Sequence, residues 1–361
     1  MKIGIIGGGA SGTFLAIRLK EKDPSLEVTI IEKNDKLLKK VLVTGNGRCN
    51  YANVGNLTDK YNDSFANALL KKFTPQDIIS AFERYGVHPT YLDQLVFPVS
   101  LSAQTIVLML NKMINIFGVD VRLDETCLDY QKTDDGFIVR TNKNSYQFDK
   151  LVFTSGGKAY PQLGTDGAVL DLLKKHGYQI NKLSPSLSPI KVKENTKKIS
   201  GQRVKCHVSL LNNKDLVYEE DGEVLFKDDG LSGIVILNMS SVINRLEDKS
   251  DIKVVLNLAP SSHELDQDQY YEYVSPKIAD YLINNNLDIH NLTYTFKGFY
   301  DFEIAEVSHG GLSLEEVTDS LESKKEEGLY FAGEVLDIDG MCGGYNLMFA
   351  FASAEAVKKA I

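Results

Sequence analysis

Cysteine is scarce in this chain of 361 residues, and the cysteines present are not arranged for a metal or redox centre. No two of them are spaced as C-x-x-C, the spacing that zinc sites and dithiol redox motifs use. A disulfide paired with a flavin is disfavoured for the same reason, and we expect free thiols in a reducing compartment. The four cysteines are Cys49, Cys127, Cys206 and Cys342.

An excess of basic charge and long apolar runs are also missing. The chain has 40 Lys and Arg against 49 Asp and Glu, a net charge of -9, and this charge disfavours a nucleic-acid partner. The strongest apolar stretch, around residues 233–237, is far too short to cross a bilayer, and no charged leader precedes the first apolar run. We therefore expect a cytoplasmic protein with a small-molecule substrate and no membrane partner. The oligomeric state stays open.

What the chain does have, at its start, is a strand, a glycine turn, a helix and a second strand. The apolar run at 2–6 leads into glycines spaced as G-x-G-x-x-G, and apolar residues then follow at helical spacing. The second apolar run, at 28–31, ends in an acidic residue. The positions concerned are Gly7, Gly9, Ala10, Ser11, Gly12 and Glu32.

Each of these positions fits the binding of a dinucleotide. Gly7 permits the tight turn, Gly9 lets a pyrophosphate approach the backbone, and Gly12 lets the helix pack closely on the strand. The helix N-terminus attracts phosphate, and Glu32 can accept hydrogen bonds from ribose hydroxyls. The charge of Glu32 repels a 2′-phosphate, which favours FAD or NAD over NADP. A purely structural turn is the alternative.

Three further glycine loops are candidates for the same ligand. The loop at 44–50 can wrap a polar ligand or be an ordinary surface loop, and the double glycine at 156–157, after a strand at 151–154, can contact a ligand or serve a plain crossover. The glycines at 343–344 precede an Ala-rich helix, whose N-terminus is a second anion site or simply docks. The strand at 119–121 could offer backbone groups to an adenine.

Several sequence features predict the domain division. The Pro/Ser-rich join at 183–189 marks a boundary, and alternating strands follow it. We expect a first domain part at 1–189, an inserted strand-rich domain at 190–305 with a helical part near 260–290, and a second domain part at 306–361. At the level of elements, the sequence predicts N-caps at Thr74 and at Thr165 or Asp166, and a polar helix at 266–282.

Seven motifs spread along the chain resemble one family, the aminoacetone-oxidase-like or BaiN-like NAD(P)/FAD-dependent oxidoreductases, also called HI0933-like flavoproteins. They are GIIGGGASG at 4–12, Glu32-Lys33, TGNGRCN at 44–50, SGGKAYPQLGTDG at 155–167, GEVLFKDDGLSG at 222–233, VSHGG at 307–311 and LYFAGEVLDIDGMCGGYNLMFAFASA at 329–354. The resemblance implies an α/β fold: a glutathione-reductase-like Rossmann FAD domain, interrupted by a β-barrel and a small helical insertion. Where many members read G-I-S-G-P, this chain has Leu231-Ser232-Gly233-Ile234, which leaves the substrate open.

By the same resemblance, the first glycine loop binds the FAD pyrophosphate and Glu32 the ribose, while the later loops line the flavin and its ribityl chain. With the loops read from the sequence itself, the cofactor-binding residues expected are Gly7, Gly9, Ala10, Ser11, Gly12, Glu32, Lys33, Gly47, Arg48, Cys49, Asn50, Val121, Ser155, Gly156, Gly157, Gly333, Glu334, Gly344, Tyr345 and Asn346.

The chemistry expected is that of an FAD-dependent oxidoreductase, with hydride transfer between flavin N5 and a small organic substrate or NAD(P)H. No second G-x-G-x-x-G appears, so NAD(P)H would bind only transiently. No catalytic acid or base is identified; Cys49, Tyr160, His309 and Cys342 are weak candidates, each more often structural. The alternatives are a tRNA-modifying flavoprotein and a dinucleotide-binding protein without catalysis.

Overall fold

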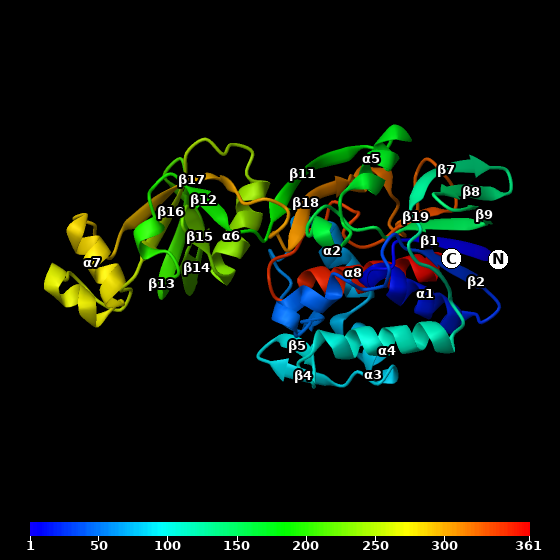
Figure 1. Cartoon of the computed structure of the whole chain (residues 1–361), viewed down its shortest axis with the longest axis horizontal. Coiled ribbons are helices and arrows are strands. Elements are labelled where there is room, and N and C mark those ends of the chain that lie inside the picture. Colours follow the sequence, from blue (N-terminus) through cyan, green and yellow to red (C-terminus); the bar gives the residue numbers. More distant parts are fainter. The chain divides into compact units, whose positions relative to one another are not determined.

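The computed structural model describes residues 1–361, which form two compact units. Unit 1 contains residues 1–184 and 307–361, and unit 2 contains residues 185–306 (Figure 1). The domain division expected from the sequence stays a prediction, because compactness alone does not show that a unit folds by itself.

Unit 1 is built on a five-stranded parallel sheet with the strand order β19-β10-β1-β2-β6. The apolar runs predicted as strands form β1 (Lys2–Ile6), β2 (Glu27–Ile31), β10 (Lys150–Phe153) and β19 (Leu329–Phe331). The edge strands are β19 and β6 (Asp120–Arg122). The first and last helices, α1 (Ala10–Lys22) and α8 (Tyr345–Ala360), lie side by side (Figure 1). Their contact includes Phe14 and Phe351, whose ring centroids are 5.0 Å apart. The two ends of the sequence therefore share one core.

The other elements of unit 1 form three small sheets and the helices around them. The sheets have the strand orders β3-β5-β4, β7-β8-β9 and β11-β18. Their strands are β3 (Ala52–Asn53), β4 (Pro89–Leu92), β5 (Leu95–Pro98), β7 (Cys127–Thr133), β8 (Gly136–Thr141), β9 (Ser145–Phe148), β11 (Ile180–Ser186) and β18 (Val307–Leu312). The helices are η1 (Val41–Gly47), α2 (Ser64–Lys72), α3 (Pro75–Arg84), α4 (Ala103–Ile116), η2 (Pro161–Leu163), α5 (Ala168–Lys175) and η5 (Leu314–Glu316).

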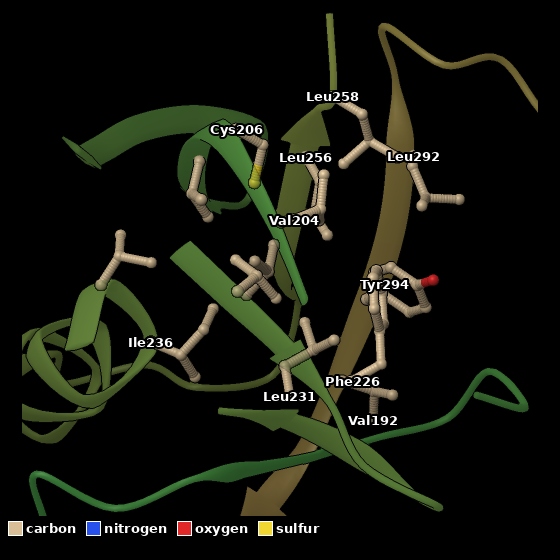
Figure 2. Close-up of a cluster of buried hydrophobic side chains, with 14 of the residues drawn as sticks. Val192, Val204, Cys206, Phe226, Leu231, Ile236, Leu256, Leu258, Leu292 and Tyr294 are labelled. Carbon is tan, nitrogen blue, oxygen red and sulfur yellow. The ribbon is translucent and has the colours of Figure 1, made fainter. Parts of the chain in front are cut away.

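Unit 2 is a closed barrel with the strand order β12-β15-β14-β13-β16-β17. Apolar side chains from the strands and from α6 meet in its core, among them Val204, Phe226 and Tyr294 (Figure 2). Along β13, Cys206 is buried while His207 lies outside, as the alternation of a strand requires. The elements are β12 (Ile190–Val192), η3 (Lys197–Ile199), β13 (Arg203–Asn212), β14 (Asp215–Phe226), β15 (Gly230–Ser232), α6 (Ile234–Arg245), β16 (Ile252–Asn257), η4 (Gln267–Glu272), α7 (Pro276–Asn284) and β17 (Leu292–Phe299).

Two local expectations were wrong and one was confirmed. The single helix expected at 266–282 is split into η4 and α7, because Pro276 has no N–H to continue a helix and instead starts a new one after Ser275. The N-cap of α5 is Gly167 rather than Thr165 or Asp166. The capping box at Thr74 is present, with Pro at the start of α3. None of the helices combines the length and apolar character needed to span a bilayer.

Candidate functional site

The first glycine turn has the geometry that its sequence spacing predicts. Gly7 has φ +109°, and a Cβ on it would lie 2.8 Å from the carbonyl oxygen of Thr154. A Cβ on Gly12 would lie 2.0 Å from the carbonyl oxygen of Gly7, so only glycine fits at both positions. Around Gly9, the N-cap of α1, nothing lies within 4 Å of a Cβ position. The N-terminus of α1 therefore opens onto free space that an anion can enter.

Glu32 is buried at the end of β2 and its carboxylate is oriented by backbone and side-chain donors. Oε2 accepts a hydrogen bond from the Gly8 N–H at 2.7 Å. Oε1 accepts from the Asn34 N–H at 2.8 Å and from Asn34 Nδ2 at 2.7 Å. Each carboxylate oxygen can accept more than one hydrogen bond, so these contacts fix the group without excluding a ribose hydroxyl.

A cavity of about 220 Å³ joins this turn to the crossover that follows β10. Ser155 Oγ, in its wall, is buried and has no hydrogen-bond partner, so it is available to a ligand. Of the residues expected to bind the cofactor, the wall contains Gly7, Glu32, Lys33, Ser155, Gly156 and Gly157. The remainder of the wall is formed by Ile6, Ile31, Glu125, Thr126, Cys127, Gly164, Asp166, Gly167, Ala168 and Val169.

The segment after β6 reaches the cavity at residues that the sequence analysis did not assign to the cofactor. Val121, expected near an adenine, is paired with Ile30 on the edge strand of the sheet and does not line the cavity, whereas residues 125–127 do. No glycine or motif marks these three positions, so only the course of the chain after β6 reveals them.

An ion pair between Lys33 and Asp166, 2.8 Å apart, connects the two sides of the cavity wall. Burial acts to raise the pKa of Asp166, but the Lys33 ammonium and the Ala168 N–H lower it by more, so the carboxylate stays ionised near neutral pH. Between the same two sides of the cavity wall, Asn34 Nδ2 donates to the carbonyl oxygen of Leu163 at 3.2 Å. The segment around 163–167 is thus held against the end of β2.

The end of β19 lies against the start of α1. Ser11 Oγ donates to the carbonyl oxygen of Ala332 at 3.4 Å, and a Cβ on Gly333 would lie 2.5 Å from Ser11 Oγ. The Gly333 N–H donates to Ser353 Oγ of α8 at 2.9 Å, and the Gly333 Cβ position is 3.9 Å from Ala350 Cβ. Ala350 is five residues beyond the start of α8, about 8 Å along its axis. Both helix N-termini are therefore within reach of one extended ligand.

The N-terminus of α8 is bounded by the predicted loop at 44–50 and the strand after it. Asn50 Oδ1 is buried and has no hydrogen-bond partner, and a Cβ on Gly344 would lie 2.7 Å from it. Asn53 Nδ2 donates to the carbonyl oxygen of Gly343 at 2.9 Å, and the Asn346 amide pairs with both backbone groups of Gly340 at 2.8 Å. The loop before α8 is thereby fixed in one conformation, while Gly47 and Arg48 are exposed.

Three acidic residues of the segment between β19 and α8 are each held by a consecutive residue of β18. The Ser308 N–H donates to Glu334 Oε1 at 2.8 Å, and the Gly310 N–H donates to Asp337 Oδ1 at 3.0 Å. Between them, the His309 ring places Nδ1 2.8 Å from Asp339 Oδ1. Lys40 Nζ lies 2.7 Å from the other oxygen of Glu334. Of these residues, only Glu334 and His309 were expected from the sequence. Asp337 and Asp339 were not, although two acidic residues just before a glycine loop are a signal that could have found them.

The four weak catalytic candidates have different surroundings. Cys49 is fully buried, and burial raises the pKa of its thiol to about 12, so it is neutral near neutral pH. Tyr160 has φ +59° at the start of η2, and Cys342 is partly exposed in the loop before α8. His309 is paired with a buried carboxylate, that of Asp339.

Comparison with known proteins places this geometry in a family. The sequence profile of the HI0933-like protein Rossmann domain matches residues 1–360. The chain belongs to this family. The resemblance read from the motifs is thereby confirmed, and with it the class of FAD-dependent oxidoreductase.

Full-length relatives and a solved structure agree with this assignment. The 3-dehydro-bile acid delta(4,6)-reductase of Clostridium scindens is 28% identical over 402 residues, covering 99% of this chain and 98% of its own. The ribosomal RNA dihydrouridine synthase of Haemophilus influenzae is 27% identical over 393 residues, covering 98% and 96%. The open conformation of a flavocytochrome c3 fumarate reductase is 14% identical with a TM-score of 0.51, covering 99% of this chain and 76% of that one. The predicted Rossmann fold is confirmed, and the closed barrel is present.

Proposed function

We propose that this protein binds FAD in an extended form across unit 1 and uses it to reduce a carbon–carbon double bond conjugated to a carbonyl group in a small organic substrate. The bound flavin would transfer the hydride between its N5 and the substrate, and transiently bound NAD(P)H would supply the electrons. The observation that carries the proposal is the cavity beside the first glycine turn, whose wall contains the buried Ser155 Oγ without a hydrogen-bond partner.

The residues present fit FAD from end to end. Glu32 and the cavity around it suit the adenosine, and the open space at Gly9 suits the pyrophosphate. The N-terminus of α8 at Gly344, with Asn50 Oδ1 unpaired beside it, suits the flavin end, where a positive helix dipole favours the charge that reduction adds. The bound cofactor would supply the hydride chemistry.

The substrate class comes from what two relatives have in common. The Clostridium scindens protein is named as a delta(4,6)-reductase of a 3-dehydro bile acid, and the Haemophilus influenzae protein as a dihydrouridine synthase. Both names describe the saturation of a carbon–carbon double bond conjugated to a carbonyl group. The same chemistry at the same flavin is the simplest activity for a chain that aligns with both over nearly its whole length.

The distribution of charge favours a small molecule over RNA. Unit 2 has 20 acidic and 13 basic residues, so it contributes seven of the nine net negative charges of the chain. Binding to a phosphate backbone depends on Lys and Arg that neutralise phosphates. An acidic unit 2 weakens such binding, and for this reason ribosomal RNA is the second candidate rather than the first.

The proposal is tested on the purified protein in three steps. A visible spectrum should show bound flavin, and anaerobic titration with NADH and with NADPH should bleach it. A steroid with a 3-oxo-4-ene group, added to the reduced protein, should then restore the oxidised spectrum, whereas a ribosomal RNA fragment should not. A protein that is colourless and takes up no FAD would overturn the proposal; reoxidation by the RNA alone would transfer the activity to the second candidate.

A further inference from the structure

The pair formed by His309 and Asp339 combines a buried carboxylate with an imidazole that reaches the surface of unit 1. The side chain of Asp339 is 0% exposed, while that of His309 is 22% exposed. The carboxylate is close to the Nδ1 edge of the ring, at 2.8 Å. A buried carboxylate at this nitrogen retains the proton on Nδ1 and leaves Nε2 as the nitrogen that exchanges a proton.

Backbone contacts fix Asp339 close to the start of α8. The Asp339 N–H donates to Asn62 Oδ1 at 2.9 Å, and its carbonyl oxygen accepts from the Asn62 N–H at 3.0 Å. Tyr61, the neighbouring residue, donates to the carbonyl oxygen of Tyr345 at 2.8 Å. Asp339 is therefore anchored to Asn62, whose neighbour Tyr61 contacts the helix end assigned above to the flavin.

On the other side, β18 has room for a side chain at His309 but not at the next two positions. A Cβ on Gly310 would lie 2.3 Å from the carbonyl oxygen of Lys182, and a Cβ on Gly311 would lie 2.9 Å from that of Val335. The strand is thus pressed between β11 and the segment after β19. His309 is the one ionisable side chain that β18 presents to that segment.

We propose that His309 is the catalytic proton donor of the flavin reaction and that Asp339 is its positioning residue. This rests on the proposed function. Saturating a conjugated double bond needs a hydride at one carbon and a proton at the other. The hydride and its electron pair would be supplied by the reduced cofactor, which would be left in its oxidised form. His309 gives the proton from Nε2 and becomes neutral, and the substrate gains two hydrogens as its double bond becomes single.

The test uses the holoenzyme and the variants His309→Gln and Asp339→Asn. Each is reduced anaerobically with dithionite and mixed with a 3-oxo-4-ene steroid, and flavin reoxidation is followed by stopped flow. Losing a general acid should slow reoxidation by about 10²- to 10⁴-fold in His309→Gln. Asp339→Asn should slow it as well. FAD content and the dithionite step, which need no proton from His309, should be unchanged in both variants.

A second readout does not depend on turnover. Nitrogen NMR of the His309 ring in its neutral form should show the proton on Nδ1 in the wild type and its loss from Nδ1 in Asp339→Asn. The tautomer tests whether Asp339 orients the His309 ring, and the reoxidation rate tests whether His309 donates the proton. The proton on Nε2 in the wild type, or an unchanged ring in Asp339→Asn, would contradict the assignment of Asp339.

The chain offers a matched control in unit 2. His207 Nδ1 also lies 2.8 Å from a carboxylate oxygen, that of Asp221, but the Asp221 side chain is 83% exposed. His207→Gln and Asp221→Asn should reoxidise at the wild-type rate. Wild-type speed in His309→Gln would overturn the proposal for His309. If the steroid does not reoxidise the wild-type protein, the result counts against the substrate class alone. The tautomer of the His309 ring then tests whether Asp339 positions it.

Discussion

Gly9 and Gly12 stand three residues apart in the first glycine motif, and the structure gives each glycine a different role. Gly12 is needed by the fold, because a Cβ there would meet the carbonyl oxygen of Gly7 at 2.0 Å and Thr154 Oγ1 at 2.5 Å. Gly9 meets nothing within 4 Å, so the fold alone does not demand it. Its role is to leave the N-terminus of α1 open to a ligand.

This difference makes the two substitutions to alanine separable. Gly12→Ala should lower the free energy of unfolding of the apo protein by about 3 kcal/mol, because backbone must move to admit the methyl group. Gly9→Ala should lower it by less than about 1 kcal/mol, the scale of an N-cap change, yet weaken FAD binding. Thermal unfolding of the apo protein and FAD titration measure the two effects. Equal losses of stability would contradict the separation.

Cys49 shows at the same scale how surroundings decide reactivity. The motif around it is one of the seven that resemble a flavoprotein family, and the residue type alone allows a thiolate. Because the thiol is fully buried, its pKa is raised to about 12, and the nucleophilic thiolate is scarce near neutral pH. His309, by contrast, has the buried carboxylate of Asp339 beside its ring, and this neighbour gives it a chemical role.

Among the elements, α3 and α4 begin in different ways although both have a hydroxyl residue at the N-cap. Thr74 Oγ1 accepts from the Asp77 N–H at 3.2 Å, and Asp77 Oδ2 accepts from the Thr74 N–H at 2.8 Å. Ser102, the N-cap of α4, makes no such bond. The capping box therefore stabilises α3, while α4 depends on the packing of its apolar face.

Replacing each N-cap residue by alanine should show that the hydroxyl stabilises α3 but not α4. Thr74→Ala should lower the free energy of unfolding by about 1 kcal/mol, since the Asp77 N–H loses its partner. Ser102→Ala, the matched control, should change it by less than about 0.5 kcal/mol. Urea unfolding at constant m-value provides the comparison. The same loss in both variants would show that the hydroxyl of Thr74 contributes nothing particular to α3.

For the whole molecule, the two units have separate hydrophobic cores, and every residue assigned to the cofactor belongs to unit 1. The barrel core of unit 2 is filled by its own apolar side chains (Figure 2). A ligand that binds a folded unit stabilises that unit by mass action. The cofactor should therefore act on the two units unequally.

Calorimetry of the apo protein should show two unfolding transitions, and added FAD should raise only one of them. At a free FAD concentration 100 times Kd, the stabilisation of unit 1 should be about 2.7 kcal/mol. FMN, which lacks the adenosine that suits the cavity at Glu32, should shift that transition less. A single transition that shifts with FAD would mean that the units unfold together. Equal shifts with FMN and with FAD would contradict the placement of the adenosine in the cavity.

The sequence by itself determined the local units: the glycine turn and its acidic partner, the strands of the parallel sheet, the cap of α3 and the family. These features depend on neighbours in the chain or on short spacings, so a pattern of residues is enough to specify them. Tertiary structure decided which distant residues share a wall, such as Glu125 and Asp166, and which acid His309 meets. Those partners lie 30 or more residues apart, and only the folded path of the backbone brings them together.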